Sequence, residues 1–432
     1  MPIDRRRFIV ATGLSVAGGA LARAQAAPKA VASAAGRDWA WVREQFPARR
    51  DLAHFSMFYI ASHPRCVTDA IEKLRREIDE DPFGVVEHGL FTRPGQVRAA
   101  AAEYLGGHAD EVALTRCTTE GIAHVYAGVR LRPGQEVLTT THDHYVHQEA
   151  VRLATSKAGA GMRRLALYDD PAKADADEII ARLRQGLRPE TRVVGLTWVH
   201  SSTGVKLPIR RLAGVVREAN AARGADDRML LLVDGVHGFG SEDETVAEMG
   251  CDFFAAGTHK WIFGPRGTGI LWGRREAWAQ LQPTVPAFEL PPFEAWMRGQ
   301  DPGATQAVSM SPGGFHAYEH MWALPAAFQF HKELGRARVA ARIHELNGRI
   351  KDGLLGLRRV KLHTPRADSL SAGLVCFEVD GLTADEVVRQ LLAKRVVASA
   401  SPYYPSYARL AGSLLNSPEE VDAAVRAVGG LS

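Results

Sequence analysis

Short apolar runs that alternate with helical patterns constrain the fold of this chain more than any other feature. The runs are rich in β-branched residues or leucine, and amphipathic segments separate them. Such alternation predicts an α/β fold in which helices cover both faces of a mostly parallel sheet. Active sites in such sheets form at the carboxyl ends of the strands. The runs are Glu111–Thr115, Glu136–Thr140, Arg192–Trp198 and Met229–Val233, and helical segments between them include Asp177–Leu187 and Ile209–Arg223.

The pattern changes after about Pro312, where long helical stretches replace the alternating runs. This change predicts a separate, smaller C-terminal α+β domain. Its expected elements are a helical stretch Tyr318–Leu355, a strand within Ala372–Val379, a helix Ala384–Lys394 and a final helix from Pro418. We therefore predict a signal peptide over residues 1–26, an N-terminal segment over 27–50, a large domain over 51–311 and a small domain over 312–432.

The N-terminus has the pattern of an export signal. Arg5, Arg6 and Arg7 precede a short apolar run, Val10–Leu21, and the small residues of ALARAQA follow. This order of basic, apolar and small residues is typical of a signal peptide, and the run is too short and too interrupted by glycine to span a bilayer. The arginines with Phe8 resemble a twin-arginine motif, which exports folded proteins. We expect a periplasmic protein, with an ordinary secretory signal or an uncleaved anchor as the alternatives.

Composition narrows the functional class. Lys and Arg together number 53 against 49 Asp and Glu, and the excess of four is scattered, so no basic surface for nucleic acid is expected. Small-molecule chemistry is the better prediction. The four cysteines lack CxxC or metal-ligand spacing and are interpreted as mostly buried small hydrophobes.

One acid and one amine stand at strand ends. Asp234 directly follows the apolar run Met229–Val233, and Lys260 comes twenty-six residues later, after a second apolar run. The glycine-rich turn Gly264–Gly269 then precedes another strand-like segment. That turn alone is a weak signal, because it lacks the spacing and the helix of a nucleotide fingerprint. An acid, an amine and a tight turn together predict a catalytic site.

These segments resemble the pyridoxal-phosphate (PLP)-dependent aminotransferase class V family. The nearest pattern is its isopenicillin N epimerase-like branch, and cysteine desulfurases are more distant. The resemblance covers nearly all of the chain beyond the signal and implies the type I PLP-dependent transferase fold, with PLP bound in the large domain. It is carried by VDGVH and GTHKW with the spacing between them, and by the RCTTEG loop, SSTGVKLPI, GPRGTG and YARLAGSLLN.

The resemblance implies catalytic roles for three residues. Lys260 is expected to bind the cofactor's aldehyde covalently and later to move the substrate's α-proton, which requires a lysine with a lowered pKa. Asp234 is expected to bind the protonated ring nitrogen, since the opposite charge keeps that nitrogen protonated. His237 matches the family position that contacts the cofactor's 3′-oxygen.

The resemblance also implies a phosphate site at the start of a helix. Thr118 and Thr119 supply hydroxyls there, and the helix N-terminus supplies backbone N–H groups. Thr258 and His259 match further phosphate contacts. In this fold a partner subunit commonly adds a glycine-rich turn, for which Gly314 is the candidate. We therefore expect a homodimer whose subunits share their active sites.

Three further positions are expected at the cofactor or the substrate. Tyr145 is the first choice for stacking on the cofactor ring, and His144 is the alternative, because many relatives have a histidine there. Ser201 lies where relatives often have an asparagine near the cofactor oxygen, which is a departure from the family pattern. Arg409 matches the arginine that binds a substrate carboxylate, a task that suits a bidentate guanidinium.

Taken singly, several of these residues also fit ordinary roles. Thr118 and Thr119 could cap a helix, which is compatible with binding phosphate. Lys260 and Arg409 could be solvated charges, and Tyr145 a core aromatic. The H-x-H-x-x-H spacing of His142, His144 and His147 could hold a metal ion, but without nearby cysteine or carboxylate partners we predict no metal site.

The expected reaction takes place at the α-carbon of an amino acid or a peptide-like amine. The fold and cofactor leave transamination, epimerisation and elimination open, because each depends on which substrate bond is activated. Sulfur transfer is disfavoured, since no cysteine occurs between Cys251 and Cys376, and Cys376 lies within an apolar run. Two alternatives remain: a periplasmic tailoring enzyme of siderophore maturation, and a binding module that kept the fold but lost catalysis.

Overall fold

The computed structural model describes residues 35–432, and a seven-stranded sheet forms the centre of this part. Strand β8 runs antiparallel to its two neighbours, and the remaining pairs are parallel, which confirms the predicted mostly parallel sheet. In spatial order the strands are β2 (Val112–Thr115), β8 (Gly269–Gly273), β7 (Phe253–Gly257), β6 (Leu230–Asp234), β5 (Thr191–Thr197), β3 (Glu136–Thr140) and β4 (Gly161–Leu165).

Helices cover both faces of this sheet because side chains alternate along each strand. In β6, Leu230 and Leu232 join a core cluster with α6 and α7, whereas Leu231 and Val233 join the opposite cluster with α8 and α9. The continuous apolar strands are therefore buried on both sides, as a parallel sheet requires. The helices are α6 (Thr118–Gly128), α7 (Tyr145–Ala158), α8 (Ala176–Gly186), α9 (Ile209–Asn220) and the short α10 (Val246–Met249).

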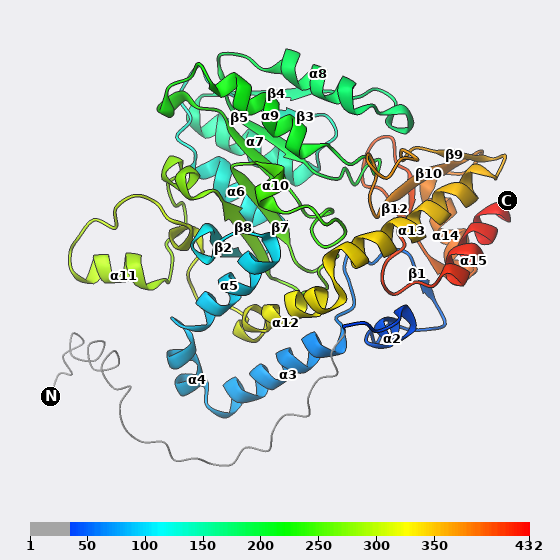
Figure 1. Cartoon of the computed structure of the whole chain (residues 1–432), viewed down its shortest axis with the longest axis horizontal. Helices are drawn as coiled ribbons and strands as arrows, with labels where there is room; N and C mark the ends of the chain where they lie inside the picture. Colours follow the sequence, from blue (N-terminus) through cyan, green and yellow to red (C-terminus); the bar gives the residue numbers. More distant parts are fainter. Residues whose placement is uncertain (1–34) are drawn as a thin grey trace. The chain divides into compact units, whose positions relative to one another are not determined.

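The N-terminal helices and α12 pack together beside the sheet. Helix α12 lies against α3 and α5, and their apolar side chains extend the larger core cluster (Figure 1). Helix α11 lies on a segment that loops away from the sheet (Figure 1). The elements are α2 (Trp39–Glu44), α3 (Arg65–Glu80), α4 (Pro82–Gly89), α5 (Arg93–Leu105), α11 (Leu290–Met297) and α12 (Tyr318–Leu334), with 3₁₀ turns at Ala109–Glu111, Pro171–Lys173, Ala225–Asp227, Arg275–Gln280 and Ala307–Met310.

The C-terminal elements form a second, smaller sheet with its own core, as predicted (Figure 1). Its four antiparallel strands follow the order β12, β13, β10, β9, and helices α13, α14 and α15 pack on it. The predicted single helical stretch from 318 to 355 is divided at Gly335, whose positive φ of 85° interrupts the helix. The elements are α13 (Arg336–Leu355), β9 (Val360–Leu362), β10 (Val375–Val379), α14 (Ala384–Ala393), β12 (Ser399–Ala400), β13 (Ala408–Leu410) and α15 (Pro418–Gly429).

A two-residue strand near the N-terminus joins the C-terminal elements. β1 (Ala53–His54) pairs in parallel with β11 (Val396–Val397), and Phe55 is buried in the C-terminal core. The described residues, 35–432, belong to one compact unit, so the predicted boundary at residue 312 stays a prediction. The predicted export signal lies outside the described residues. Within residues 35–432, no helix has the length and apolar character needed to cross a membrane.

Candidate active site

A cavity of about 600 Å³ opens at the carboxyl ends of β5, β6 and β7. This is the edge at which open α/β sheets bind their ligands. The C-terminal sheet closes one side of the cavity through β12 and β13, so both sheets contribute to the wall. Its lining residues are Phe58, Tyr59, Ile60, Cys117, Thr118, Thr119, His144, Val146, Thr197, Ser201, Asp234, Val236, His237, His259, Lys260, Ser399, Ala400, Pro402 and Arg409.

Lys260 and His237 meet in this cavity. Lys260 follows β7, His237 follows β6, and Nζ of the lysine lies 3.2 Å from Nε2 of the histidine. Burial lowers the pKa of Lys260 to about 8, although the nearby Asp234 carboxylate opposes that change. Burial and the Lys260 charge lower the pKa of His237 well below its ordinary value. A neutral imidazole can therefore accept a hydrogen bond from the lysine amine.

Asp234 is the last residue of β6, and its carboxylate is buried. Oδ1 accepts a hydrogen bond from the backbone N–H of Val236 at 3.1 Å. Burial raises the pKa of Asp234, while the nearby Lys260 charge acts in the opposite direction. A buried carboxylate of this kind needs a cationic partner, which the protonated ring nitrogen of a cofactor would provide.

The N-terminus of α6 also lines the cavity. Thr118 and Thr119 are the first two residues of the helix, where backbone N–H groups have no partners within the helix. The Thr118 hydroxyl oxygen accepts a hydrogen bond from the backbone N–H of Gly257 at 2.7 Å, which fixes the helix end to β7. Thr119 is exposed to the cavity. These contacts place both predicted phosphate ligands at one helix N-terminus.

Arg409 enters the cavity from β13 and is buried. Its guanidinium donates hydrogen bonds to the carbonyls of Ser201 and Ala400, both at 3.0 Å, and to the Ser399 hydroxyl at 3.2 Å. The group lies over the Phe58 ring, 4.8 Å from its centroid. A guanidinium has five N–H groups, so those beyond these three bonds can bind a carboxylate.

Comparison with known proteins identifies the family. The family model for aminotransferase class-V proteins matches residues 62–401. The chain belongs to this family. Isopenicillin N epimerase of Streptomyces clavuligerus is 26% identical over 85% of this chain and 92% of its own length. A probable cysteine desulfurase of Pseudomonas aeruginosa is 30% identical over 68% of this chain and 69% of its own length.

Solved structures confirm the type I PLP-dependent transferase fold for this class-V chain. A mutant of C-DES with glycine covalently linked to its PLP cofactor has a TM-score of 0.81 and 23% identity, and the match covers 90% of this chain and 99% of that one. The cystine C–S lyase C-DES with its product cysteine persulfide has a TM-score of 0.80 and 24% identity. PLP, the predicted cofactor, is thereby confirmed as the cofactor of this family member.

The cavity of this class-V protein fits PLP. Asp234 supplies a carboxyl group, Lys260 supplies an amine, and the N-terminus of α6 supplies backbone N–H groups that could bind a phosphate. Among the described residues, Nδ1 of His237 is buried without a hydrogen-bond partner, and such an atom is costly unless a ligand or water satisfies it. Asp234 would hold the ring nitrogen, Lys260 the aldehyde, and Thr118 with Thr119 the phosphate. These residues lie where the sequence predicted them to be, and their roles stay predictions.

The structure corrects the choice between Tyr145 and His144. Tyr145 is 68% exposed at the start of α7 and is not part of the cavity wall. His144, the alternative, lines the cavity, and its Nδ1 accepts a hydrogen bond from the backbone N–H of Val146 at 3.3 Å. The first residue of a helix and the residue before it point in different directions. His144 is therefore the better candidate for stacking on the cofactor ring, and that role stays a prediction.

Thr258 lies away from the cavity where it was predicted to bind phosphate, whereas the phosphate contact predicted for His259 stays a prediction. The Thr258 side chain is fully buried, and its hydroxyl bonds Thr268, 2.5 Å from the Thr268 hydroxyl and 3.1 Å from its carbonyl. It therefore fixes the turn between β7 and β8 and does not reach the cavity. His259 lines the cavity, and burial together with the Lys260 charge lowers its pKa to about 4.

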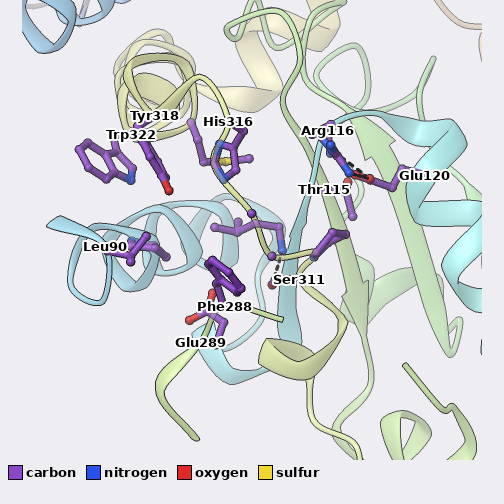
Figure 2. A pocket seen from close by; sticks show the side chains of 16 residues that line it. Leu90, Thr115, Arg116, Glu120, Phe288, Glu289, Ser311, His316, Tyr318 and Trp322 are labelled. Carbon is purple, nitrogen blue, oxygen red and sulfur yellow. Dashed lines mark hydrogen bonds and ion pairs between the residues drawn. The ribbon is translucent and has the colours of Figure 1, made fainter. Parts of the chain in front are cut away.

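Gly314 lies away from this cavity, in a separate pocket drawn in Figure 2. Figure 2 shows Tyr318 beside Trp322, and their rings stack at 4.9 Å. The Ser311 hydroxyl accepts a hydrogen bond from Leu114 N–H at 3.0 Å, which anchors the loop that carries Gly314. Gly314 has a φ of +114°, a conformation suited to glycine. A contribution of this residue to a partner's site stays a prediction.

The three spaced histidines have separate partners. His142 stacks on Tyr168 with ring centroids 3.8 Å apart, His144 lines the cavity, and His147 bonds the Tyr126 hydroxyl at 2.6 Å. In the part of the chain that the structure describes, no group of three or more His, Cys, Asp or Glu could hold a metal ion.

Sequence reasoning missed Tyr403. It lies on the loop between β12 and β13, and its hydroxyl is 2.6 Å from the Ser201 hydroxyl at the edge of the cavity. The only signal was an aromatic-rich segment, SPYYPS, directly before the recognised YAR motif. Phe58 was noted only as part of an early segment near the site, and the structure places its ring under Arg409.

Proposed function

We propose that this PLP-dependent class-V protein acts at the α-carbon of an amino acid or a peptide-like amine, as an aminotransferase, an epimerase or a lyase. The observation that carries the proposal is the meeting of Lys260, Asp234 and Arg409 in one cavity. Each of the three groups answers a different chemical requirement of such a reaction. That the protein is a PLP-dependent enzyme follows from its family, whereas the proposal that it reacts at the α-carbon rests on these three residues.

Bound PLP supplies an electron sink that stabilises negative charge at the substrate's α-carbon. Asp234 holds the proton on the ring nitrogen, because a buried carboxylate favours the nearby cation. Lys260 holds and moves the α-proton through Nζ, and its pKa of about 8 leaves a substantial neutral fraction near neutral pH. His237 accepts a hydrogen bond from that amine and orients it.

Arg409 sets the substrate class. Its guanidinium is held by three acceptors and by the Phe58 ring, so it presents its remaining N–H groups in a fixed direction. A carboxylate is the anion that such a planar fork binds best. The proposed substrate therefore has both an amine and a carboxylate, as amino acids and peptide-like metabolites do.

Sulfur transfer through a cysteine nucleophile is not supported by the cysteine positions. Cys251 and Cys376 are fully buried, and burial raises the pKa of each thiol to about 12, so neither forms a thiolate near neutral pH. Burial likewise raises the pKa of Cys66 to about 11. Cys117 lines the cavity, but it lies next to the phosphate-binding threonines and not beside Arg409.

The proposal includes a homodimer with shared active sites. Tyr59 and Ile60 expose apolar surface at the cavity, and Phe315, next to Gly314, is 79% exposed. Exposed apolar side chains of this size are suited to a protein partner. A second copy of the chain would cover them and bring Gly314 to the cavity of its partner.

The proposed location is the periplasm, reached through the twin-arginine route. It is supported by the arginine motif and the apolar run in the sequence. A folded, cofactor-loaded enzyme has a physical reason to use this route, since PLP is made in the cytoplasm. Within this proposal, tailoring of a siderophore is one alternative, and a binding module without catalysis is another.

Spectroscopy and covalent trapping test the proposed function. Purified protein should absorb visible light once PLP is bound, and borohydride should fix the cofactor onto Lys260, as peptide mass spectrometry would show. Lys260→Ala should lose the trapped product, and Lys361→Ala, which removes an exposed lysine, should retain it. Incubation with L- and D-amino acids would then separate keto acid release, ammonia release and α-proton exchange. Protein that takes up no PLP would overturn the proposal, and uptake without any turnover would favour the binding module.

A further inference from the structure

The loop between β12 and β13 is closed at its base and reaches toward the cavity at its tip. Ser401 N–H donates to the Tyr407 carbonyl at 2.8 Å, and Tyr407 N–H donates to the Ser401 hydroxyl at 2.9 Å. Pro402 lines the cavity, whereas Tyr404 is fully exposed. Tyr403, the residue before Tyr404, is half-buried, so the two neighbouring tyrosines of this loop differ in exposure.

Tyr403 joins this loop to the central sheet. Its hydroxyl lies 2.6 Å from the hydroxyl of Ser201, which follows β5. Its ring meets His144 edge to face, with centroids 5.9 Å apart and an interplanar angle of 81°. Burial raises the pKa of the Tyr403 phenol, so the hydroxyl keeps its proton and can take part in the bond as a neutral group.

Ser201 contacts Tyr403 and Arg409 through different atoms. Its hydroxyl bonds the tyrosine, and its backbone carbonyl accepts the hydrogen bond from Arg409 Nη1 at 3.0 Å. The second guanidinium nitrogen bonds the carbonyl of Ala400, which directly precedes the loop. Movement of the loop tip or of Ser201 would therefore change the direction of two of the three bonds that hold the guanidinium.

We propose that Tyr403 is a positioning residue that fixes Arg409 through Ser201 and so makes the site selective for amines that bear a carboxylate. This inference rests on the proposed function, because it assumes that Arg409 binds the carboxylate. Phenylalanine at position 403 would keep the ring against His144 and remove only the hydroxyl bond. A side-chain hydrogen bond of this kind corresponds to an effect of about threefold to tenfold.

Two small nucleophiles that attack the bound cofactor test the inference without knowledge of the substrate. Aminooxyacetate bears a carboxylate, whereas O-methylhydroxylamine does not, and both remove the visible absorbance of PLP enzymes as they react. In the PLP-loaded Tyr403→Phe variant, the rate constant for aminooxyacetate should fall about threefold to tenfold relative to wild type. The rate constant for O-methylhydroxylamine should be unchanged, because that probe makes no use of Arg409.

Two further variants are matched controls. Tyr404→Phe makes the same chemical change at the neighbouring, fully exposed tyrosine and should react like wild type with both probes. Ser201→Ala keeps the carbonyl that binds Arg409 and removes only the hydroxyl, so it should reproduce the loss seen with Tyr403→Phe. In the double variant, the rate constant for aminooxyacetate should fall no further than in either single variant, since all three variants remove the same hydrogen bond.

The outcomes separate this inference from the proposed function. Wild type that binds no PLP overturns both. Wild type that binds PLP but reacts equally with the two probes overturns the carboxylate role of Arg409 and with it the role of Tyr403. Three results would overturn the inference alone. The Tyr403→Phe variant could react with aminooxyacetate at the wild-type rate, or it could react more slowly with both probes by the same factor. The loss of rate in the double variant could also be the sum of the losses in Tyr403→Phe and Ser201→Ala. Thermal melting of each variant shows whether the fold is retained.

Discussion

The Nζ atom of Lys260 lies 3.2 Å from Nε2 of His237, at the ends of two adjacent parallel strands. Both groups are withdrawn from water, and burial lowers the pKa of each. Two basic groups this close are best accommodated when at least one of them is neutral. The pair therefore holds a lysine amine ready to react at a pH where an exposed lysine would be almost fully protonated.

The capture of PLP by cofactor-free protein should follow the neutral form of Lys260. Because burial lowers the pKa from 10.5 to about 8, the neutral fraction rises with pH up to about 8 and then levels off. Below that value the rate of capture should rise about tenfold per pH unit. Stopped-flow absorbance over a pH series would measure this, and a rate that is still rising steeply near pH 10 would contradict the lowered pKa.

Asp234→Asn should abolish most turnover and leave covalent capture by Lys260 intact. The amide oxygen can still accept the Val236 N–H, but a neutral amide no longer keeps the ring nitrogen protonated. We expect the rate constant of α-proton exchange to fall about 100-fold or more. Asp177→Asn, at an exposed surface carboxylate, is the control. An exchange rate close to wild type in Asp234→Asn would disprove the role of the carboxylate.

His144→Ala and Tyr145→Ala form a matched pair of neighbouring substitutions. His144 lines the cavity, so its removal should weaken PLP affinity about tenfold and shift the visible absorbance of the bound cofactor. Tyr145 is exposed in the single chain, so its loss should leave both quantities unchanged. Titration with PLP measures the affinities. The reverse result would restore the sequence-based preference for Tyr145.

Arg409→Lys should impair substrates that bear a carboxylate. Lysine keeps the charge but has no planar fork, so it cannot reproduce the three bonds to Ser201, Ala400 and Ser399 while binding a carboxylate. We expect kcat/KM for such a substrate to fall about 10- to 100-fold, mostly through KM. Arg389→Lys, at an exposed position on α14, should have no effect. Equal kinetics for wild type and Arg409→Lys would remove Arg409 from the substrate site.

Gly195→Ala should destabilise the fold, because a methyl group at this position in β5 would overlap the hydroxyl of Tyr126 and the ring of His147. Overpacking of this kind costs about 1–3 kcal/mol. Gly348→Ala, in the middle of α13 with open space around the new methyl group, should instead stabilise the protein by up to about 1 kcal/mol. Urea denaturation of the cofactor-free variants measures both changes, and equal midpoints for the two would refute this packing.

The tertiary structure decided which neighbouring side chains face the site. His144 and Tyr145 are adjacent, and only the start of α7 at Tyr145 directs the first into the cavity and the second toward solvent. Thr258 precedes His259 and Lys260, yet its hydroxyl is hydrogen-bonded to the Thr268 hydroxyl and does not face the cavity. Sequence order could not separate these cases, because side-chain direction depends on backbone dihedrals and on partners from other strands.

The sequence by itself determined the mostly parallel sheet and placed Asp234 and Lys260 at its carboxyl edge, since strand periodicity and glycine turns are local signals. Only the tertiary structure showed that Tyr403 bonds Ser201, a residue 202 positions away in the chain. That contact depends on how the C-terminal sheet packs against the central one. Packing of this kind is a property of the whole fold, because it is set by many weak contacts between distant segments and not by any short pattern of residues.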